Sequence, residues 1–232
     1  KFGMEHHRLL WATTSQIQRL QELISEETEQ REIPLRRDID ALGTLLGEVL
    51  HDQGGRSLFD TVEHLRHLAK QHRDLPDSSS NNPLDSEHSR AISMIVRAIG
   101  VADAYRVTKA FAIYFELANL AEANHRRRRW RAAKALKHTP QPGSFEGTLL
   151  RMKSAGITPQ QALEAIRQVE VIPVFTAHPT EVARRTVLYK RRQIARQLDQ
   201  IDWLPLTDAE AQEREAIIGA NIVALWQTDE VR

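Results

Sequence analysis

His178 is the residue whose type and position in the sequence best suit proton transfer. His178 lies within the stretch Val171 to Leu188, whose first five residues are apolar and mostly β-branched and whose residues from Val182 onward follow helical spacing. The stretch predicts a strand, a tight turn and a helix, with His178 at the carboxyl end of the strand. An imidazole titrates near neutral pH, so a histidine in such a loop can accept or donate a proton.

The residues that follow His178 also favour a loop. Pro179 disfavours the helical conformation for the residue before it, Thr180 is a good helix N-cap, and Glu181 suits the positive first turn of a helix. Helix amino termini placed after strands attract anions, because free backbone N–H groups point outward there. The alternative is that His178 only caps the helix or satisfies a buried carbonyl group.

The neighbouring residues favour the catalytic interpretation. The sequence Thr176-Ala177-His178-Pro179-Thr180-Glu181, followed by Arg184-Arg185-Thr186-Val187-Leu188, closely resembles the histidine motif of the phosphoenolpyruvate carboxylase family. The resemblance continues over nearly the whole chain from about residue 34, although only the histidine motif is specific enough to indicate the family by itself. The other similar segments begin at Leu42, Phe59, Phe115 and Trp226.

The resemblance implies a fold and a reaction. The family's enzymes are mostly helical and are built around a (β/α)8 barrel, so residues Val171 to Thr176 would be the first barrel strand. They convert phosphoenolpyruvate and bicarbonate to oxaloacetate and phosphate, with Mg²⁺ or Mn²⁺ as cofactor. By resemblance, His178 is the general base that takes the carboxyl proton of carboxyphosphate and so promotes release of CO2.

Arg184 and Arg185 match an arginine pair that, in plant members of the family, is associated with an effector anion at a subunit contact. We expect them one to two turns into the helix, where neighbouring side chains point in different directions and do not easily serve one ligand. The family's phosphate loop, metal-binding carboxylates and second histidine lie in its much longer carboxyl-terminal portion. No metal ligand is therefore expected among these residues.

Composition sets further limits. The 232 residues carry 32 Lys and Arg against 31 Asp and Glu, so no overall charge directs the chain to nucleic acid or membrane. The absence of cysteine excludes disulfides and thiolate metal sites. Since the chain begins at Lys1 without a methionine, we expect a fragment or a trimmed chain. The resemblance implies that it is the amino-terminal part, inactive alone, of a cytoplasmic enzyme that forms homotetramers and binds neither nucleic acid nor membrane.

The fold class predicted is mainly α, a helical bundle-like region that contains only the first strand of a barrel. Residues 1–33 are expected to form a leader or an amphipathic helix, residues 34–170 a helical region, and residues 171–232 the strand, the histidine loop and further helices. The expected helices cover residues 34–50, 58–69, 89–99, 101–137, 149–153, 158–169, 182–199 and 208–228. A lone strand leaves its backbone unpaired, so its partners must lie outside these residues, or it pairs poorly.

Other features carry alternative readings. Phe111, Tyr114 and Phe115 are expected to pack in the core.

The basic run Arg126 to Arg131 could bind RNA, which would make the chain a helical RNA-binding or scaffold module. Cations late in a helix also complement the helix dipole, and we favour the interpretation that this run is a solvated helix end. His64 and His67 share helical spacing without a recurring carboxylate, so a solvated face is favoured over a metal site. A phosphotransfer histidine must project from mid-helix, and Pro179 disfavours that for His178.

Overall fold

The computed structural model describes residues 10–11, 16–25, 27–73, 87–135, 140, 143–175, 184–202 and 206–228. Within these ranges the chain forms nine α-helices and one π-helical turn, and no β-strand. The elements are α1 (Gln16–Ile24), α2 (Thr28–Val49), η1 (Leu50–Gly54), α3 (Arg56–Arg73), α4 (Glu87–Ala98), α5 (Val101–Ala135), α6 (Phe145–Ser154), α7 (Pro159–Arg167), α8 (Arg185–Ile201) and α9 (Asp208–Gln227). The mainly helical fold class is confirmed.

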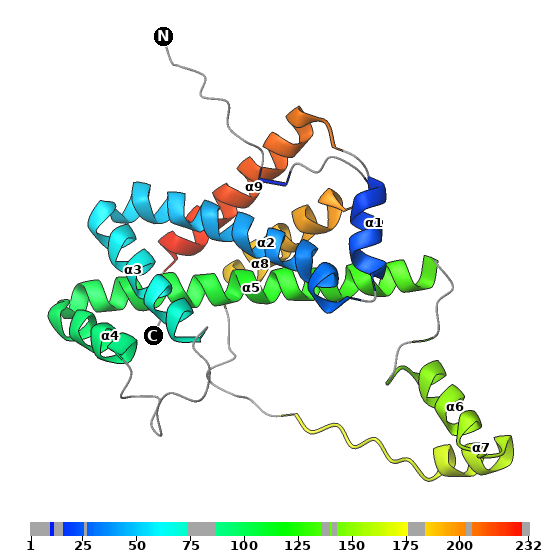
Figure 1. Cartoon of the computed structure of the whole chain (residues 1–232). Coiled ribbons are helices and arrows are strands. Elements are labelled where there is room, and N and C mark those ends of the chain that lie inside the picture. The colour runs from blue at the N-terminus through cyan, green and yellow to red at the C-terminus, as the bar shows by residue number, and fades with distance from the viewer. Residues whose placement is uncertain are drawn as a thin grey trace.

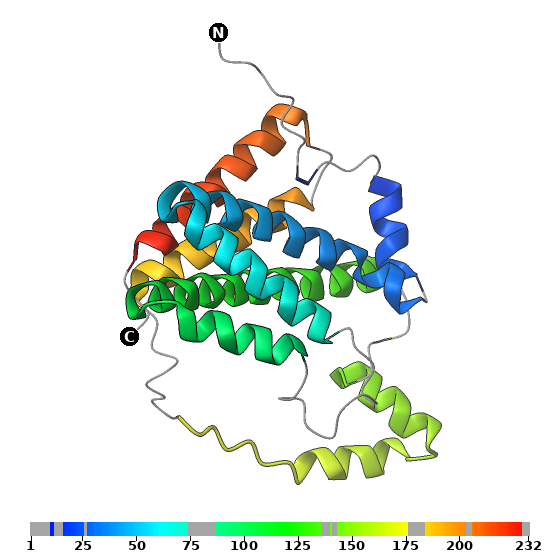
Figure 2. The same ribbon diagram turned by 60° about the vertical axis from the view of Figure 1, so that its left-hand side comes forward.

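The long helix α5 is the axis of the molecule. Its 35 residues extend for about 50 Å at 1.5 Å per residue, and α2, α8 and α9 pack along it (Figure 1). Helices α3 and α4 pack against each other at one end of this bundle, and α1 crosses near the other end (Figure 2). No helix in the described part of the chain is both long and apolar enough to cross a membrane.

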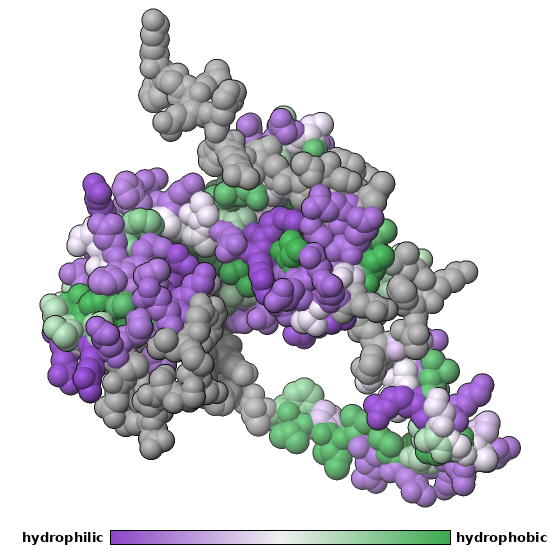
Figure 3. Space-filling model, in the orientation of Figure 1, coloured by the Kyte–Doolittle hydropathy of each residue, from purple (hydrophilic) through white to green (hydrophobic). Residues whose placement is uncertain are grey.

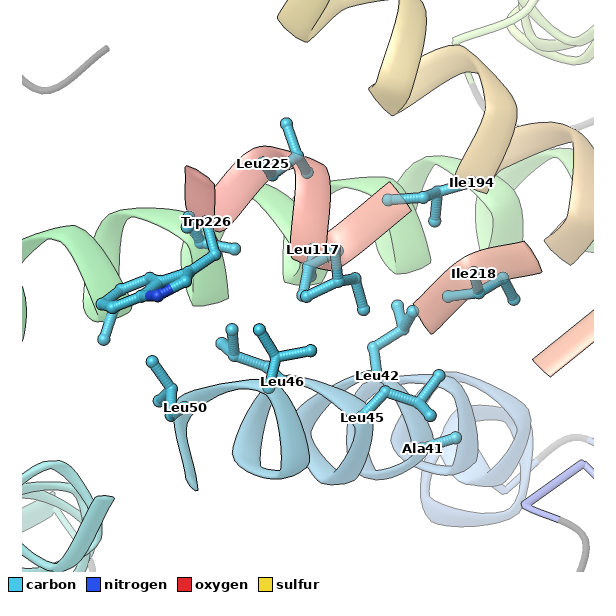
Figure 4. Close-up of a cluster of buried hydrophobic side chains, with 14 of the residues drawn as sticks. Ala41, Leu42, Leu45, Leu46, Leu50, Leu117, Ile194, Ile218, Leu225 and Trp226 are labelled. Carbon is cyan, nitrogen blue, oxygen red and sulfur yellow. The ribbon is translucent and has the colours of Figure 1, made fainter. Parts of the chain in front are cut away.

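The core lies between four helices. Leu42, Leu46 and Leu50 point from α2 and η1 toward Leu117 on α5 and toward the apolar face of α9 (Figure 4). These positions repeat every three or four residues along each helix, so one face of each helix is buried. Helix α9 contributes Ile218, Ile222, Leu225 and Trp226 to the core, and α8 contributes Ile194.

Helix α2 begins earlier than the sequence indicates. The expected start was Pro34, but the helix begins at Thr28 and Pro34 lies inside it. Proline within a helix removes one backbone hydrogen bond. The amino-terminal turns of α2 nevertheless form, because α1 packs against α2 and tertiary packing outweighs the local preference.

Helices α4 and α5 lie within two residues of the expected ranges, but one core assignment in α5 is wrong. Phe111 and Tyr114 pack against the core, whereas Phe115 is 60% exposed. Leu117 and Ile113, on either side of Phe115 in the sequence, are buried. The helical period therefore directs Phe115 away from the bundle.

Helices α6 and α7 form a pair that stands apart from the bundle (Figures 1 and 2). Helix α7, expected over residues 158–169, begins with a capping box: the Thr158 hydroxyl accepts a hydrogen bond from Gln161 N, and the Gln161 side chain accepts one from Thr158 N at 2.9 Å. Pro159 occupies the first turn, where its missing N–H costs nothing. This reciprocal capping fixes the start of the helix that leads into the predicted strand.

Candidate active site

The segment that leads to the histidine motif is extended but unpaired. Residues 171–175 belong to no helix or strand, so the predicted strand is not formed within the described residues. The physical reason is the one expected from sequence: a strand needs neighbours to pair its backbone, and the described part of the chain offers none. In the space-filling view of Figure 3 this segment is a row of apolar residues, coloured green, below the bundle.

Both faces of the extended segment are apolar. Val171 and Phe175 alternate with Ile172 and Val174, and all four side chains are exposed, up to 93% for Phe175. A strand with one solvated face would alternate apolar and polar residues. Apolar side chains on both faces are typical of a strand buried in a parallel sheet between layers of helices.

His178 itself lies outside the described residues, as do Thr176, Pro179, Thr180 and Glu181. Its position in the chain is bracketed by the extended Phe175 on one side and by Arg184 on the other. The role of His178 as general base therefore stays a prediction.

Arg184 and Arg185 lie at a different place in the helix than expected. The expected start near Val182 is wrong, because Arg184 is extended, with φ −60° and ψ 146°, and is the N-cap of α8. The first turn of α8 contains no acidic residue, so two cations stand at the positive end of the helix dipole, where an anion would be stabilised. Both residues are exposed. Because Arg184 precedes the helix, the divergence expected of neighbouring side chains within a helix does not apply to this pair.

Three ion pairs hold α8 against α5. Arg191 Nε lies 2.9 Å from Glu116 Oε2, and Arg131 Nη1 lies 2.8 Å from Asp199 Oδ1. Arg128 Nε lies 2.8 Å from Asp202 Oδ2 at the carboxyl end of α8. Since α8 is the first described helix after the histidine motif, these contacts fix the element that carries the motif's carboxyl end.

The Arg128 guanidinium also reaches α2. Its Nη2 donates to Asp38 Oδ2 at 2.9 Å, and Trp11 Nε1 donates to Asp38 Oδ1 at 3.1 Å. Burial raises the pKa of Asp38 above its usual value, and the Arg128 charge offsets only part of that rise. One buried cation thus joins α2, α5 and α8, with Asp202 as its second carboxylate.

His125 is buried beside this cluster. Its side chain is 6% exposed, and burial lowers the pKa of His125 to about 4, with the Arg128 and Arg129 charges adding to the effect. The imidazole is therefore neutral at pH 7 and contributes no charge to the basic run.

The basic run is not simply a solvated helix end. Arg128 and His125 belong to the interior, which corrects the expectation for these two residues. Arg131 is engaged with Asp199 and Arg127 donates to Asn124 Oδ1 at 3.2 Å. An RNA-binding surface would need these cations free to meet phosphates, so the RNA-binding alternative is not supported.

Metal ligands are not gathered in the described part of the chain. No group of three or more histidine, aspartate or glutamate side chains there could hold a metal ion. His64 and His67 are both exposed on α3.

Sequence reasoning missed the buried charges, although their spacing carries a signal. Asp38 occupies the buried stripe of α2 with Ala41, Leu42 and Leu45, and Glu215 occupies that of α9. Arg128 continues the buried stripe of α5. A charged residue at a core position of an amphipathic helix predicts a buried partner, because an unpaired charge is costly there.

Comparison with known proteins identifies the class. The model of the family described as phosphoenolpyruvate carboxylase matches residues 35–232. The chain belongs to this family of carboxylating enzymes.

Individual relatives agree with this assignment. The phosphoenolpyruvate carboxylase of Paraburkholderia xenovorans (strain LB400) is 37% identical over 205 residues, which cover 88% of this chain and 20% of that protein. That of Ralstonia nicotianae is 35% identical over 199 residues, covering 86% and 19%. That of Aromatoleum aromaticum is 33% identical over 205 residues, covering 88% and 22%. The chain thus spans about a fifth of the length of the curated relatives it matches.

Proposed function

We propose that this chain is the amino-terminal part of a phosphoenolpyruvate carboxylase, which forms oxaloacetate and phosphate from phosphoenolpyruvate and bicarbonate. The observation that carries the proposal is the family match over residues 35–232, which includes His178 and its motif. The exposed segment at residues 171–175, which is apolar on both faces, supports it, since such a segment needs a sheet to enter.

The proposed reaction has three steps. A bicarbonate oxygen attacks the phosphorus of phosphoenolpyruvate, and the bond from phosphorus to the enol oxygen breaks, which leaves carboxyphosphate and the enolate of pyruvate. Carboxyphosphate then loses its carboxyl proton and separates into CO2 and phosphate. The enolate carbon attacks CO2, and the new carbon–carbon bond gives oxaloacetate.

His178 is proposed as the base for the second step. A neutral imidazole with a pKa near 6.5 accepts the carboxyl proton at working pH, and removal of that proton drives the release of CO2. A loop at the end of a barrel strand, as the sequence predicts for His178, would give the ring access to a bound reactant. The metal ion that the family uses is expected to bind in the carboxyl-terminal portion of the enzyme.

Arg184 and Arg185 are proposed to bind an effector anion. The two cations and the free N–H groups at the start of α8 form one positive surface, which suits a phosphorylated or carboxylated ligand. The ion pairs between α5 and α8 would hold that surface in place.

A chimera tests the proposed function. The matched 205 residues of the Paraburkholderia xenovorans enzyme would be replaced by the corresponding part of this chain, and oxaloacetate formation would be measured with phosphoenolpyruvate and bicarbonate. We expect activity from the chimera and none from the 232-residue chain alone, because the match covers only 20% of that enzyme. Oxaloacetate formation by the chain alone would overturn the second expectation, and a folded but inactive chimera the first.

A further inference from the structure

A groove of about 700 Å³ lies between α2, η1, α3 and α5, away from the extended segment. Two glycines on α2 form part of its floor. A Cβ atom at Gly47 would lie 3.2 Å from Phe59 Cε2, and one at Gly43 would lie 3.8 Å from Tyr114 Cε2. Because neither glycine carries a side chain, both rings can lie against the helix and form the walls of the groove.

The inner surface of the groove is apolar and aromatic. Phe111 joins Phe59 and Tyr114, and the ring of His51 meets Phe59 edge to face with 6.0 Å between the ring centroids. The faces of aromatic rings carry a negative electrostatic potential that attracts cations. The remaining apolar lining residues are Ile39, Leu46, Leu50, Val62 and Ala110.

The charged residues that line the groove are mostly acidic. Four carboxylates, those of Asp40, Glu48, Asp52 and Glu63, face one guanidinium, that of Arg66, which gives a net charge of −3 with His51 neutral. Arg66 is engaged by Glu63, with 2.7 Å between Nη2 and Oε2. Asp52 Oδ1 lies 3.3 Å from His51 Nδ1, so Asp40 and Glu48 are the main carboxylates that a ligand would meet.

These features select one class of ligand. An anion would be repelled, and within the described residues no three carboxylates or histidines converge as a metal ion requires. An apolar lining with a negative rim complements an apolar body that carries a positive charge. We propose that this groove binds an organic ammonium ion with an aromatic body.

Ammonium binding in this groove does not depend on the proposed carboxylase function, because it involves other residues and a ligand that takes no part in that reaction. The ammonium group would lie at the carboxylate rim, where Asp40 and Glu48 stand about two helical turns apart on α2. The aromatic body would pack over Gly43 and Gly47 between the rings of Phe59 and Tyr114.

Three probes of equal size separate charge from shape. Isothermal titration calorimetry of the 232-residue chain at low ionic strength would use 2-phenylethylammonium, the neutral 2-phenylethanol and the anionic phenylacetate. We expect the ammonium ion to bind at least about tenfold more tightly than the alcohol, phenylacetate to show no binding, and added salt to weaken the first interaction. Equal affinities for the ammonium ion and the alcohol, or no binding of the ammonium ion, would overturn the proposal.

Variants locate the binding site. Combined Asp40→Asn and Glu48→Gln substitutions keep the shape of the groove and should weaken ammonium binding at least about fivefold. Combined Glu122→Gln and Glu213→Gln substitutions are the matched control, because they also remove two charges and both residues are exposed and do not line the groove. An equal loss of affinity in the control would show that binding follows overall charge and would refute the assignment to the groove.

Discussion

The Arg128 Nη2 atom donates to Asp38 Oδ2 at 2.9 Å across the interface between α5 and α2. Arg128 is 9% exposed and Asp38 3% at their side chains, so this pair has little contact with water. The same guanidinium binds Asp202 beyond the end of α8. A residue from an apparent surface run of arginines therefore joins three helices of the bundle.

Removing this cation should destabilise the fold strongly. Arg128→Met leaves two carboxylates near one another without their counter-charge, and loss of one partner of a buried pair costs about 3 to 5 kcal/mol. Urea unfolding would measure the free energy. Arg126→Met, in the same run but exposed, should change it by less than about 0.5 kcal/mol. Similar losses from both variants would contradict the role given to Arg128.

The buried imidazole predicts a pH dependence of stability. The pKa of His125 is about 4 in the folded chain and about 6.5 when unfolded, so the unfolded chain binds the proton more tightly. The contribution of His125 is complete above pH 6.5 and is lost as the pH falls toward 4, by about 3 kcal/mol in all.

Comparison with His125→Asn isolates this effect. The variant should lose less stability than the parent between pH 7 and pH 4, when both are followed by urea unfolding. The raised pKa of Asp38 acts in the opposite direction, since the folded chain gains stability as that group takes up a proton, but both proteins share it. Identical pH profiles would show that His125 does not titrate as described.

The amino-terminal residues should be part of the stable fold although the family match begins at residue 35. Trp11 is 3% exposed, its Nε1 donates to Asp38, and Leu10 N donates to Glu215 Oε1 at 2.6 Å. Trp11→Ala should cost about 3 to 5 kcal/mol, because it removes a large buried side chain. Thermal and urea unfolding would measure the loss.

Trp130 offers a matched control. It is 51% exposed on α5 and lies 4.3 Å from Lys134 Nζ in a cation–π contact. Trp130→Ala should cost less than about 1 kcal/mol. If the two tryptophan substitutions cost the same, residues 10–11 do not belong to the core.

Much of the helical fold could be predicted from sequence, because periodic apolar residues and capping residues act locally. The cap at Thr158 and the stripes of α2, α5 and α9 are examples. The positions of Trp11 and Arg128 could not be predicted, because they depend on which helices meet. The strand predicted at Val171 would form only if neighbouring strands supplied its hydrogen bonds, and the described residues contain none. His178 and its loop lie outside the described residues, so the sequence remains the basis for that site.

The unpaired apolar segment should make the isolated chain self-associate. Ile172 and Val174 share one face of residues 169–175 and are exposed, and unpaired strands with apolar side chains pair with other chains. Replacing both with lysine should lower the mass measured by light scattering at high concentration. Met94→Lys, at an exposed position of α4, should leave the mass unchanged. Equal effects at both places would point to general surface hydrophobicity as the cause.

The most direct test of the central claim is the effect of His178→Asn in the active chimera. Asparagine keeps the approximate size of the side chain but cannot accept the carboxyl proton at neutral pH. Steady-state rates of oxaloacetate formation would be compared with a binding titration of phosphoenolpyruvate. The account predicts that carboxylation falls at least about a hundredfold while phosphoenolpyruvate binding changes less than about threefold, in keeping with loss of a general base. Unchanged oxaloacetate formation by the variant would contradict it.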